Sequence, residues 1–115
     1  MKIAKVLRIF AFAAAFILIA SSSAFANTFS FANRSGSTIS EVYFRPSGNS
    51  GWGNNILGGY FYDGETTSVS TYTNARYWDV YVVVSNGRTG SWVDLDLYTN
   101  QKVTITRNGC QTSRA

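Results

Sequence analysis

The amino-acid sequence predicts an all-β protein, a small antiparallel two-sheet β-sandwich of about seven strands that follows a cleaved signal peptide. Short runs of β-branched and aromatic residues are separated by clusters of Gly, Asn and Ser, and no stretch after the leader repeats apolar residues at helical spacing. No gap between neighbouring runs is long enough for a crossover helix, so antiparallel pairing is the simplest architecture.

Residues 1–26 have the three parts of an export signal. Basic residues open the chain, Ile9–Ala20 is apolar and uncharged, and Ala24-Phe25-Ala26 places small residues where a signal peptidase cuts. The serines that follow the apolar stretch leave it shorter than the roughly 20 apolar residues that span a bilayer, so cleavage is favoured over a retained membrane anchor. We therefore expect a periplasmic or secreted protein with no transmembrane span after processing.

Cleavage leaves one domain, residues 27–107, and a polar C-terminal tail, 108–115. The tail holds the only cysteine, Cys110, which cannot form an internal disulfide, although a bridge between two chains stays open. The mature chain has seven Lys and Arg against six Asp and Glu, all scattered, so nucleic acid is not an expected partner. The absence of histidine excludes Ser-His-Asp and Cys-His catalysis.

The first strands are predicted from alternation and from turn residues. Thr28–Asn33 places its two phenylalanines on one face, and Thr38–Arg45 ends against Pro46, which cannot donate a backbone hydrogen bond. Further along, Asp63-Gly64 is typical of a hairpin turn, and Thr66–Thr73 is a polar strand without charge.

The strongest strand is Tyr77–Ser85, and Asn86-Gly87 predicts a tight turn into the next strand, Ser91–Tyr98. A last strand ends at Thr106. The expected core residues of the two longer strands are Trp78, Val80, Val82 and Val84 in the first and Val93, Leu95 and Leu97 in the second.

Short motifs follow one another along the mature chain. They are Phe29-x-Phe31-x-Asn33, Tyr43-Phe44-x-Pro46-Ser47, Trp52-Gly53-x-Asn55-Ile56-Leu57, Asp63-Gly64, Trp78-Asp79-Val80, Asn86-Gly87, Trp92-x-x-x-Asp96-Leu97 and Val103-Thr104-Ile105. Their order resembles that of small exported bacterial β-sandwich proteins of uncharacterised function, a hypothetical secreted or periplasmic family. The resemblance covers nearly the whole mature chain and implies the fold and the export, but no catalytic residues.

An acidic and aromatic strand face is the first candidate site. Its residues are Trp92, Asp94, Asp96 and Tyr98, joined by Asp79 and Tyr81 if the two strands pair. Rings that stack on sugars and carboxylates that accept hydroxyl hydrogen bonds favour a glycan. Asp94 and Asp96 are also candidate ligands for calcium, which prefers oxygen atoms. The alternative is an ordinary solvent-facing surface in which Asp96 pairs with Lys102.

The glycine-rich segment Ser47–Gly59 is the second candidate site. Trp52 offers a flat ring and Asn54 and Asn55 offer side-chain amides, in the kind of loop where binding residues concentrate. The alternative is that Trp52, together with the apolar Ile56-Leu57 pair, folds inward and closes one end of the sandwich.

These features favour an exported, non-catalytic binding domain that acts at or outside the cell envelope, with a glycan as the favoured ligand and no cofactor other than calcium. A carboxylate-based glycosidase is the enzymatic alternative, but an open strand face offers little means to surround a substrate. A structural, assembly or protein-interaction module that contacts an envelope protein is the other alternative, because Thr66–Thr73 lacks the charge and proline that protect sheet edges.

Overall fold

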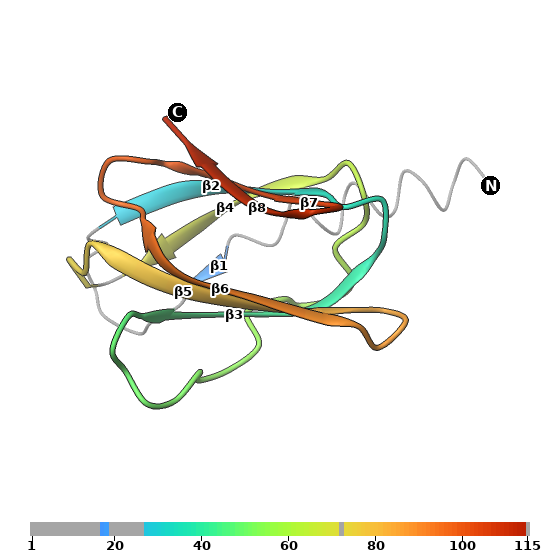
Figure 1. The fold of residues 1–115 in the computed structure, drawn as a ribbon, viewed down its shortest axis with the longest axis horizontal. Helices are drawn as coiled ribbons and strands as arrows, with labels where there is room; N and C mark the ends of the chain where they lie inside the picture. The colour runs from blue at the N-terminus through green and yellow to red at the C-terminus, as the bar shows by residue number, and fades with distance from the viewer. Residues whose placement is uncertain (1–16, 19–26, 72, 115) are drawn as a thin grey trace.

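The computed structural model describes residues 17–18, 27–71 and 73–114, which form an all-β sandwich of two facing sheets (Figure 1). One sheet has the strand order β1-β4-β2-β7-β8 and the other has β3-β5-β6. The strands are β1 Ile17–Leu18, β2 Asn27–Arg34, β3 Ile39–Pro46, β4 Thr66–Thr71, β5 Tyr77–Val84, β6 Thr89–Asp96, β7 Lys102–Thr106 and β8 Gly109–Ser113. The predicted fold class is confirmed: β2 to β7 correspond to the strands expected from the sequence, and β8 is an additional strand.

The predicted signal peptide, residues 1–26, lies outside the described residues apart from β1. This short strand pairs in parallel with β4, with Ile17 opposite Val69 and Leu18 opposite Ser70. Among the described residues no helix is long and apolar enough to cross a membrane. Cleavage after Ala26 stays a prediction.

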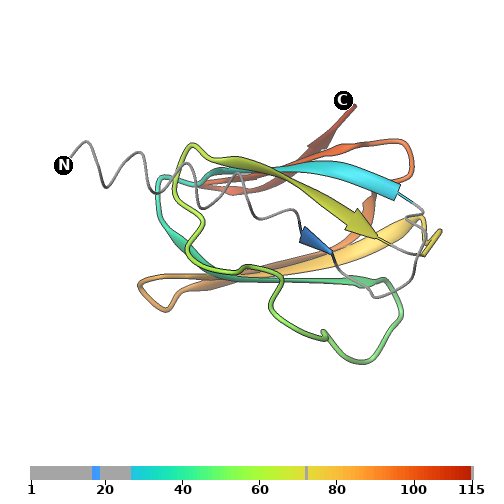
Figure 2. The ribbon, with the colours of Figure 1, turned by 180° about the vertical axis from the view of Figure 1, so that it is seen from behind.

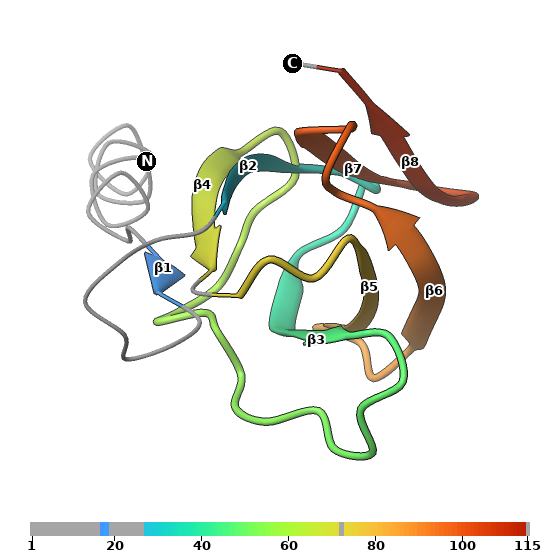
Figure 3. The same ribbon diagram turned by 90° about the vertical axis from the view of Figure 1, so that its left-hand side faces the viewer.

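Within the predicted domain, from β2 onward, one pairing departs from the antiparallel arrangement that the sequence predicts. β2 runs antiparallel to β4 but parallel to β7, with Phe31 opposite Val103. Between β2 and β7 the chain crosses to the other sheet and back twice, first through β3 and then through β5 and β6, so these two strands pair in the same direction without sharing a turn. Figure 3, an end view, shows the two sheets facing each other and β6 curving towards β8.

Aromatic side chains from both sheets interlock in the core. The rings of Phe29 and Phe31 in β2 meet Phe44 in β3 edge-to-face, with centroids 5.2 and 5.4 Å apart. Phe31 also stacks on Phe61, with centroids 5.3 Å apart. These contacts join the sheets through quadrupole-matched ring pairs as well as through buried apolar area.

The predicted core face of β5 is confirmed. Trp78, Val80 and Val82 are each at most 1% exposed, and Val84 packs against the core. The side chains between them, Asp79, Tyr81 and Val83, lie on the opposite face of the sheet, as the two-residue period of a strand requires.

A β-bulge in β6 interrupts that period in the neighbouring strand. Trp78 lies opposite Leu95 but Val80 lies opposite Trp92, so Val93 and Asp94 together oppose a single residue of β5. Asp94 takes the left-handed backbone conformation, with φ 58°. Aspartate tolerates this conformation better than most residues do, and it is a geometry that bulges use.

The bulge changes which side chains face the core at two positions of β6, Trp92 and Val93. Leu95 and Leu97 point inward as predicted, but Trp92 also packs against the core and Val93 is 60% exposed. The prediction that Val93 lies in the core and Trp92 on the outer acidic face is therefore wrong. One extra residue shifts the alternation of a strand by one position.

The predicted polar tail, 108–115, is also corrected, because Gly109–Ser113 form β8. This strand pairs antiparallel with β7, and Cys110 lies opposite Ile105. The Cys110 side chain packs against the core and is partly buried. Burial raises the pKa of the thiol to about 12.

We expect Cys110 to react slowly in the folded protein, because the thiolate is the nucleophile and burial keeps it scarce. Iodoacetamide labelling at pH 8.5, followed by mass spectrometry, should be at least tenfold slower in buffer than in guanidinium chloride. Equal rates under the two conditions would contradict the buried position.

The corrected core predicts opposite outcomes for two matched substitutions. Val82→Asp should abolish cooperative thermal unfolding, because it places an unpaired carboxylate in the core. Val93→Asp makes the same chemical change on the exposed bulge and should alter the free energy of unfolding by no more than about 0.5 kcal/mol. Circular dichroism melts of the two variants check this. A cooperative transition in Val82→Asp would show that the assigned face is wrong.

Candidate functional site

Three aromatic side chains lie in a row on the outer face of the β3-β5-β6 sheet. Tyr43 of β3 and Tyr81 of β5 are cross-strand partners, and their ring centroids are 5.7 Å apart. Trp52, from the segment that follows β3, lies beside Tyr81 at a centroid distance of 5.7 Å and an interplanar angle of 33°. All three side chains are partly exposed. We call Tyr43, Tyr81 and Trp52 the aromatic row.

The segment that carries Trp52 lies outside the sandwich. Figure 2 shows residues 47–59 extending from the end of β3 on the side away from the other sheet. The row is therefore built from a strand pair and a loop that covers part of it.

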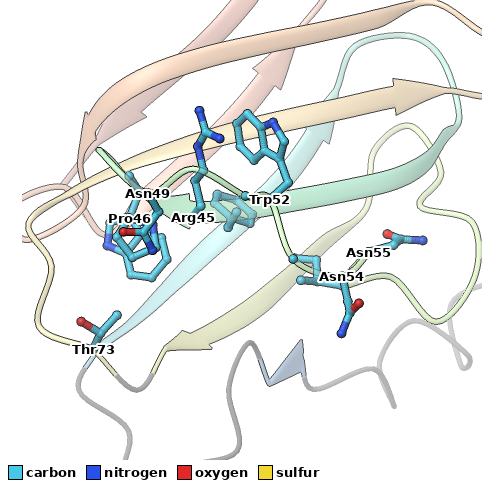
Figure 4. A pocket seen from close by; sticks show the side chains of 12 residues that line it. Arg45, Pro46, Asn49, Trp52, Asn54, Asn55 and Thr73 are labelled. Carbon is cyan, nitrogen blue, oxygen red and sulfur yellow. The ribbon is translucent and has the colours of Figure 1, made fainter.

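Arg45 holds Trp52 in place. The guanidinium carbon lies 3.9 Å from the centroid of the Trp52 ring, a cation–π contact, and Figure 4 shows the two side chains next to each other. Its Nε donates a hydrogen bond of 2.9 Å to Asp79 on the neighbouring strand. The indole thus rests on a cation that is itself fixed by a carboxylate.

Asp79 is the polar centre of this region and is only 3% exposed. Its carboxylate accepts hydrogen bonds from the Ser47 hydroxyl at 2.6 Å, from Arg45 at 2.9 Å and from the backbone N–H of Asp94 at 3.1 Å. Burial acts to raise the pKa of Asp79, but these donors outweigh it and lower the pKa. Asp79 is therefore a structural anion and is not itself open to a ligand.

Asn55 fixes the far end of the loop. Its side-chain oxygen accepts the backbone N–H groups of Val42 at 2.9 Å and of Leu57 at 3.1 Å, and Ile56 N–H donates to the Val42 carbonyl. Ile56 and Leu57 pack against the core, as the inward-folding alternative predicts, whereas Trp52 lies outside it. The sequence predicts that Asn55 contacts a ligand. The structure instead uses its side-chain oxygen to hold the loop, because that oxygen already accepts two backbone hydrogen bonds.

A pocket of about 680 Å³ lies beside the aromatic row, and Trp52 borders both. The buried rings of Phe44 and Trp78 contribute to its lining, as do the polar side chains of Asn54 and Thr73. Figure 4 shows Asn54 and Thr73 on opposite sides of the view. Apolar rings combined with amide and hydroxyl groups suit a ligand that has both apolar faces and hydroxyls.

The predicted acidic face does not form a single cluster. Asp96 forms an ion pair with Arg76 at 2.9 Å and not with Lys102. Interactions with Thr99 and Arg76 lower the pKa of Asp96 to about 2. Tyr98 is 66% exposed beside Arg76, whereas Trp92 faces inward. The six predicted residues therefore lie apart. Tyr81 belongs to the aromatic row, Asp94 to the bulge and Trp92 to the core. Asp79 and Asp96 are in separate ion pairs, and Tyr98 lies beside Arg76.

The metal hypothesis for Asp94 and Asp96 finds no support in the site geometry. Asp96 is engaged by Arg76 and by the backbone N–H groups of Tyr98 and Thr99. Within residues 17–18, 27–71 and 73–114, no three acidic, His or Cys side chains gather where they could hold a metal ion.

Sequence reasoning singled out Trp52, Tyr81 and Asp79 but missed Tyr43 and Arg45. Both missed residues lie inside the predicted strand Thr38–Arg45, for which no outer face was predicted. Their alternation with Val42 and Phe44 is the signal that could have placed them on the outer face.

Comparisons of the chain with protein-family models, with curated proteins and with solved structures found no match. The resemblance to small exported β-sandwich proteins therefore stays a prediction.

Asp79→Asn should lower the free energy of unfolding at pH 7 by about 1.5–3 kcal/mol, the contribution typical of a hydrogen bond to a charged group. The folded-state pKa of Asp79 is lowered, so its stabilisation is present above the unfolded pKa of about 3.9 and is lost as the pH falls through the folded pKa. The difference from wild type should therefore shrink below about pH 4.

Guanidinium chloride titrations between pH 2 and pH 7, followed by tryptophan fluorescence, measure this difference. Asp94→Asn is the matched control, because it removes the same charge at a position whose left-handed backbone asparagine also tolerates. If the difference in free energy of unfolding between wild type and Asp79→Asn did not change with pH, Asp79 would not be stabilising the fold as a carboxylate.

Proposed function

We propose that the protein is an exported, non-catalytic binding domain that takes carbohydrate on the outer face of the β3-β5-β6 sheet. The observation that carries this proposal is the aromatic row, in which Tyr43, Tyr81 and Trp52 form a partly exposed strip of neighbouring rings. Sugar rings present apolar C–H faces that pack on aromatic rings, and burial of that area favours binding.

The pocket next to the row supports the same ligand class. Trp52 lines the pocket as well as the row, so a glycan of more than one unit can stack on the rings and place a further unit in the pocket. Exposed Asn49 and Asn54 offer amide groups there, and Thr73 offers a hydroxyl. These groups both donate and accept hydrogen bonds, as sugar hydroxyls do.

The carboxylates near the row favour binding over catalysis. A glycosidase needs one carboxyl group with a raised pKa to act as the acid. The pKa of Asp79 is lowered, and its oxygens are engaged by Arg45 and Ser47. Glu41 accepts the hydroxyl hydrogen of Tyr43. Both carboxylates therefore help to position the aromatic row: Asp79 through Arg45, and Glu41 through Tyr43.

Binding to a glycan array and to insoluble polysaccharides tests the proposal, using protein expressed from the full-length chain. Trp52→Ala and Tyr81→Ala should each weaken binding of the best saccharide at least tenfold, about 1.4 kcal/mol. Melting temperatures of the variants separate a lost contact from lost folding.

Tyr98→Ala is the matched control, because Tyr98 is 66% exposed and contacts Arg76 but is not part of the row. It should keep wild-type affinity. Absence of saccharide binding across the panel would overturn the proposal, and so would unchanged binding by a folded Trp52→Ala variant.

An assembly module is the second candidate, and one observation favours it. On its outer side β4 is paired, among the described residues, only by the two residues of β1, which belong to the predicted leader. Cleavage of the leader would leave an uncharged edge strand of Thr, Ser and Val open to strand addition. Light scattering of the processed protein distinguishes this candidate, because it predicts an oligomer where the binding domain alone predicts a monomer.

A further inference from the structure

A second groove lies at the other end of the sandwich, away from segment 47–59. It has a volume of about 470 Å³ and is formed where three turns meet: the turn after β2, the β5–β6 hairpin and the β7–β8 hairpin. These turns gather at the right-hand end of the molecule in Figure 1. Its volume falls within the range of small-molecule sites, about 300–1,000 Å³.

Two arginines with no ionic partner line this groove. Arg88 comes from the β5–β6 hairpin and Arg107 from the β7–β8 hairpin. Among the described residues, neither guanidinium forms an ion pair or a side-chain hydrogen bond, whereas Arg45 and Arg76 each pair with an aspartate. Unpaired guanidinium groups at one site attract an oxyanion, because each offers several N–H donors in a planar fork.

The lining of the groove contains no carboxylate that would neutralise these arginines. Asp63 is bound to the same turn, since it accepts the backbone N–H of Gly36 at 2.8 Å, but it is not a lining residue. The Arg107 guanidinium lies against Gly36, where an added Cβ would come within 3.0 Å of it. Gly36 itself has a left-handed φ of 81°, a backbone conformation that glycine adopts without strain.

Trp92 supplies a flat apolar surface in the groove. The bulge turns this side chain inward, where it packs against the core, and its indole N–H has no hydrogen-bond partner among the described residues. Gly90 makes room for the ring, because an added Cβ there would lie 2.7 Å from it. A ring plane and an unused donor therefore lie in the same groove as the two arginines.

The turn after β2 forms one side of the groove, and hydrogen bonds of the Asn33 side chain hold its shape. The fully buried Asn33 side chain donates to the carbonyls of Ser37 and Phe61 at 2.8 and 2.9 Å, and it accepts the Ser35 N–H at 3.0 Å and the Ser35 hydroxyl. These bonds fix the turn before any ligand arrives. Preorganisation of this kind reduces the entropic cost of binding.

We propose that this groove binds an acidic saccharide, with the carboxylate of a hexuronate unit held by Arg88 and Arg107 and the sugar ring packed on Trp92. Thr89 and Asn108 line the groove with a hydroxyl and an amide that match sugar hydroxyls. The site is separate from the aromatic row and does not depend on it.

Isothermal titration of the full-length protein with glucuronate and with a galacturonate oligomer tests the proposal, with glucose and inorganic phosphate as comparison probes. The acidic sugars should bind at least tenfold more tightly than either comparison probe. Their affinity should fall as the salt concentration rises, because the charge contact is partly screened.

Arg88→Gln and Arg107→Gln should each weaken hexuronate binding at least tenfold, while Arg114→Gln, an exposed arginine outside the groove, should leave it unchanged. Gly90→Ala should also weaken binding by displacing the Trp92 ring, and the melting temperature checks that this variant folds. Tyr98→Ala, which removes an exposed ring that lies outside both the groove and the aromatic row, should bind hexuronate normally.

Three results would overturn the proposal. They are no detectable hexuronate binding, equal affinity for phosphate and hexuronate, and wild-type affinity in a folded variant that lacks both arginines. The second result would show an anion site that does not recognise a sugar.

Discussion

The arrangement of the β3-β5-β6 sheet depends on the hydrogen bonds that surround the buried carboxylate of Asp79. The carboxylate joins β3 through Arg45, the start of the long loop through Ser47 and the bulge of β6 through the backbone N–H of Asp94. A buried charge is tolerated only where donors surround it, so these three segments must keep their positions together. The stacking of Trp52 on Arg45 is one consequence, since the hydrogen bond to Asp79 fixes the cation on which the indole packs.

The bulge is the second consequence, and it shapes both ends of the molecule. By adding one residue opposite Asp79, it turns Trp92 towards the core and Val93 towards solvent. The outer face of the sheet is thereby left to the aromatic row, and the groove at the other end gains an indole. A single residue inserted into one strand thus separates two aromatic surfaces that a regular alternation would place differently.

These facts explain how far the sequence could predict the structure. Period-two alternation identified the buried face of β5 correctly because that pattern is local. It failed in β6 because the bulge is stabilised by Asp79, which lies 15 positions earlier in the chain. It missed β8 because that strand is polar and is held by backbone pairing with β7. Trp52 and Tyr81 could be singled out as residues, but only the register of β3 against β5 shows that Tyr43 joins them.

Charge shows the same limit of sequence reasoning. Residues 27–115 carry seven Lys and Arg against six Asp and Glu, and the sequence alone does not distinguish one arginine from another. The fold does, because Arg45 and Arg76 meet aspartates, whereas Arg88 and Arg107 lie on hairpins around a groove whose lining has no carboxylate. Near-neutral net charge therefore coexists with a locally positive end. Electrostatic attraction acts over about 10 Å at moderate salt, so recognition responds to that local field rather than to the sum over the chain.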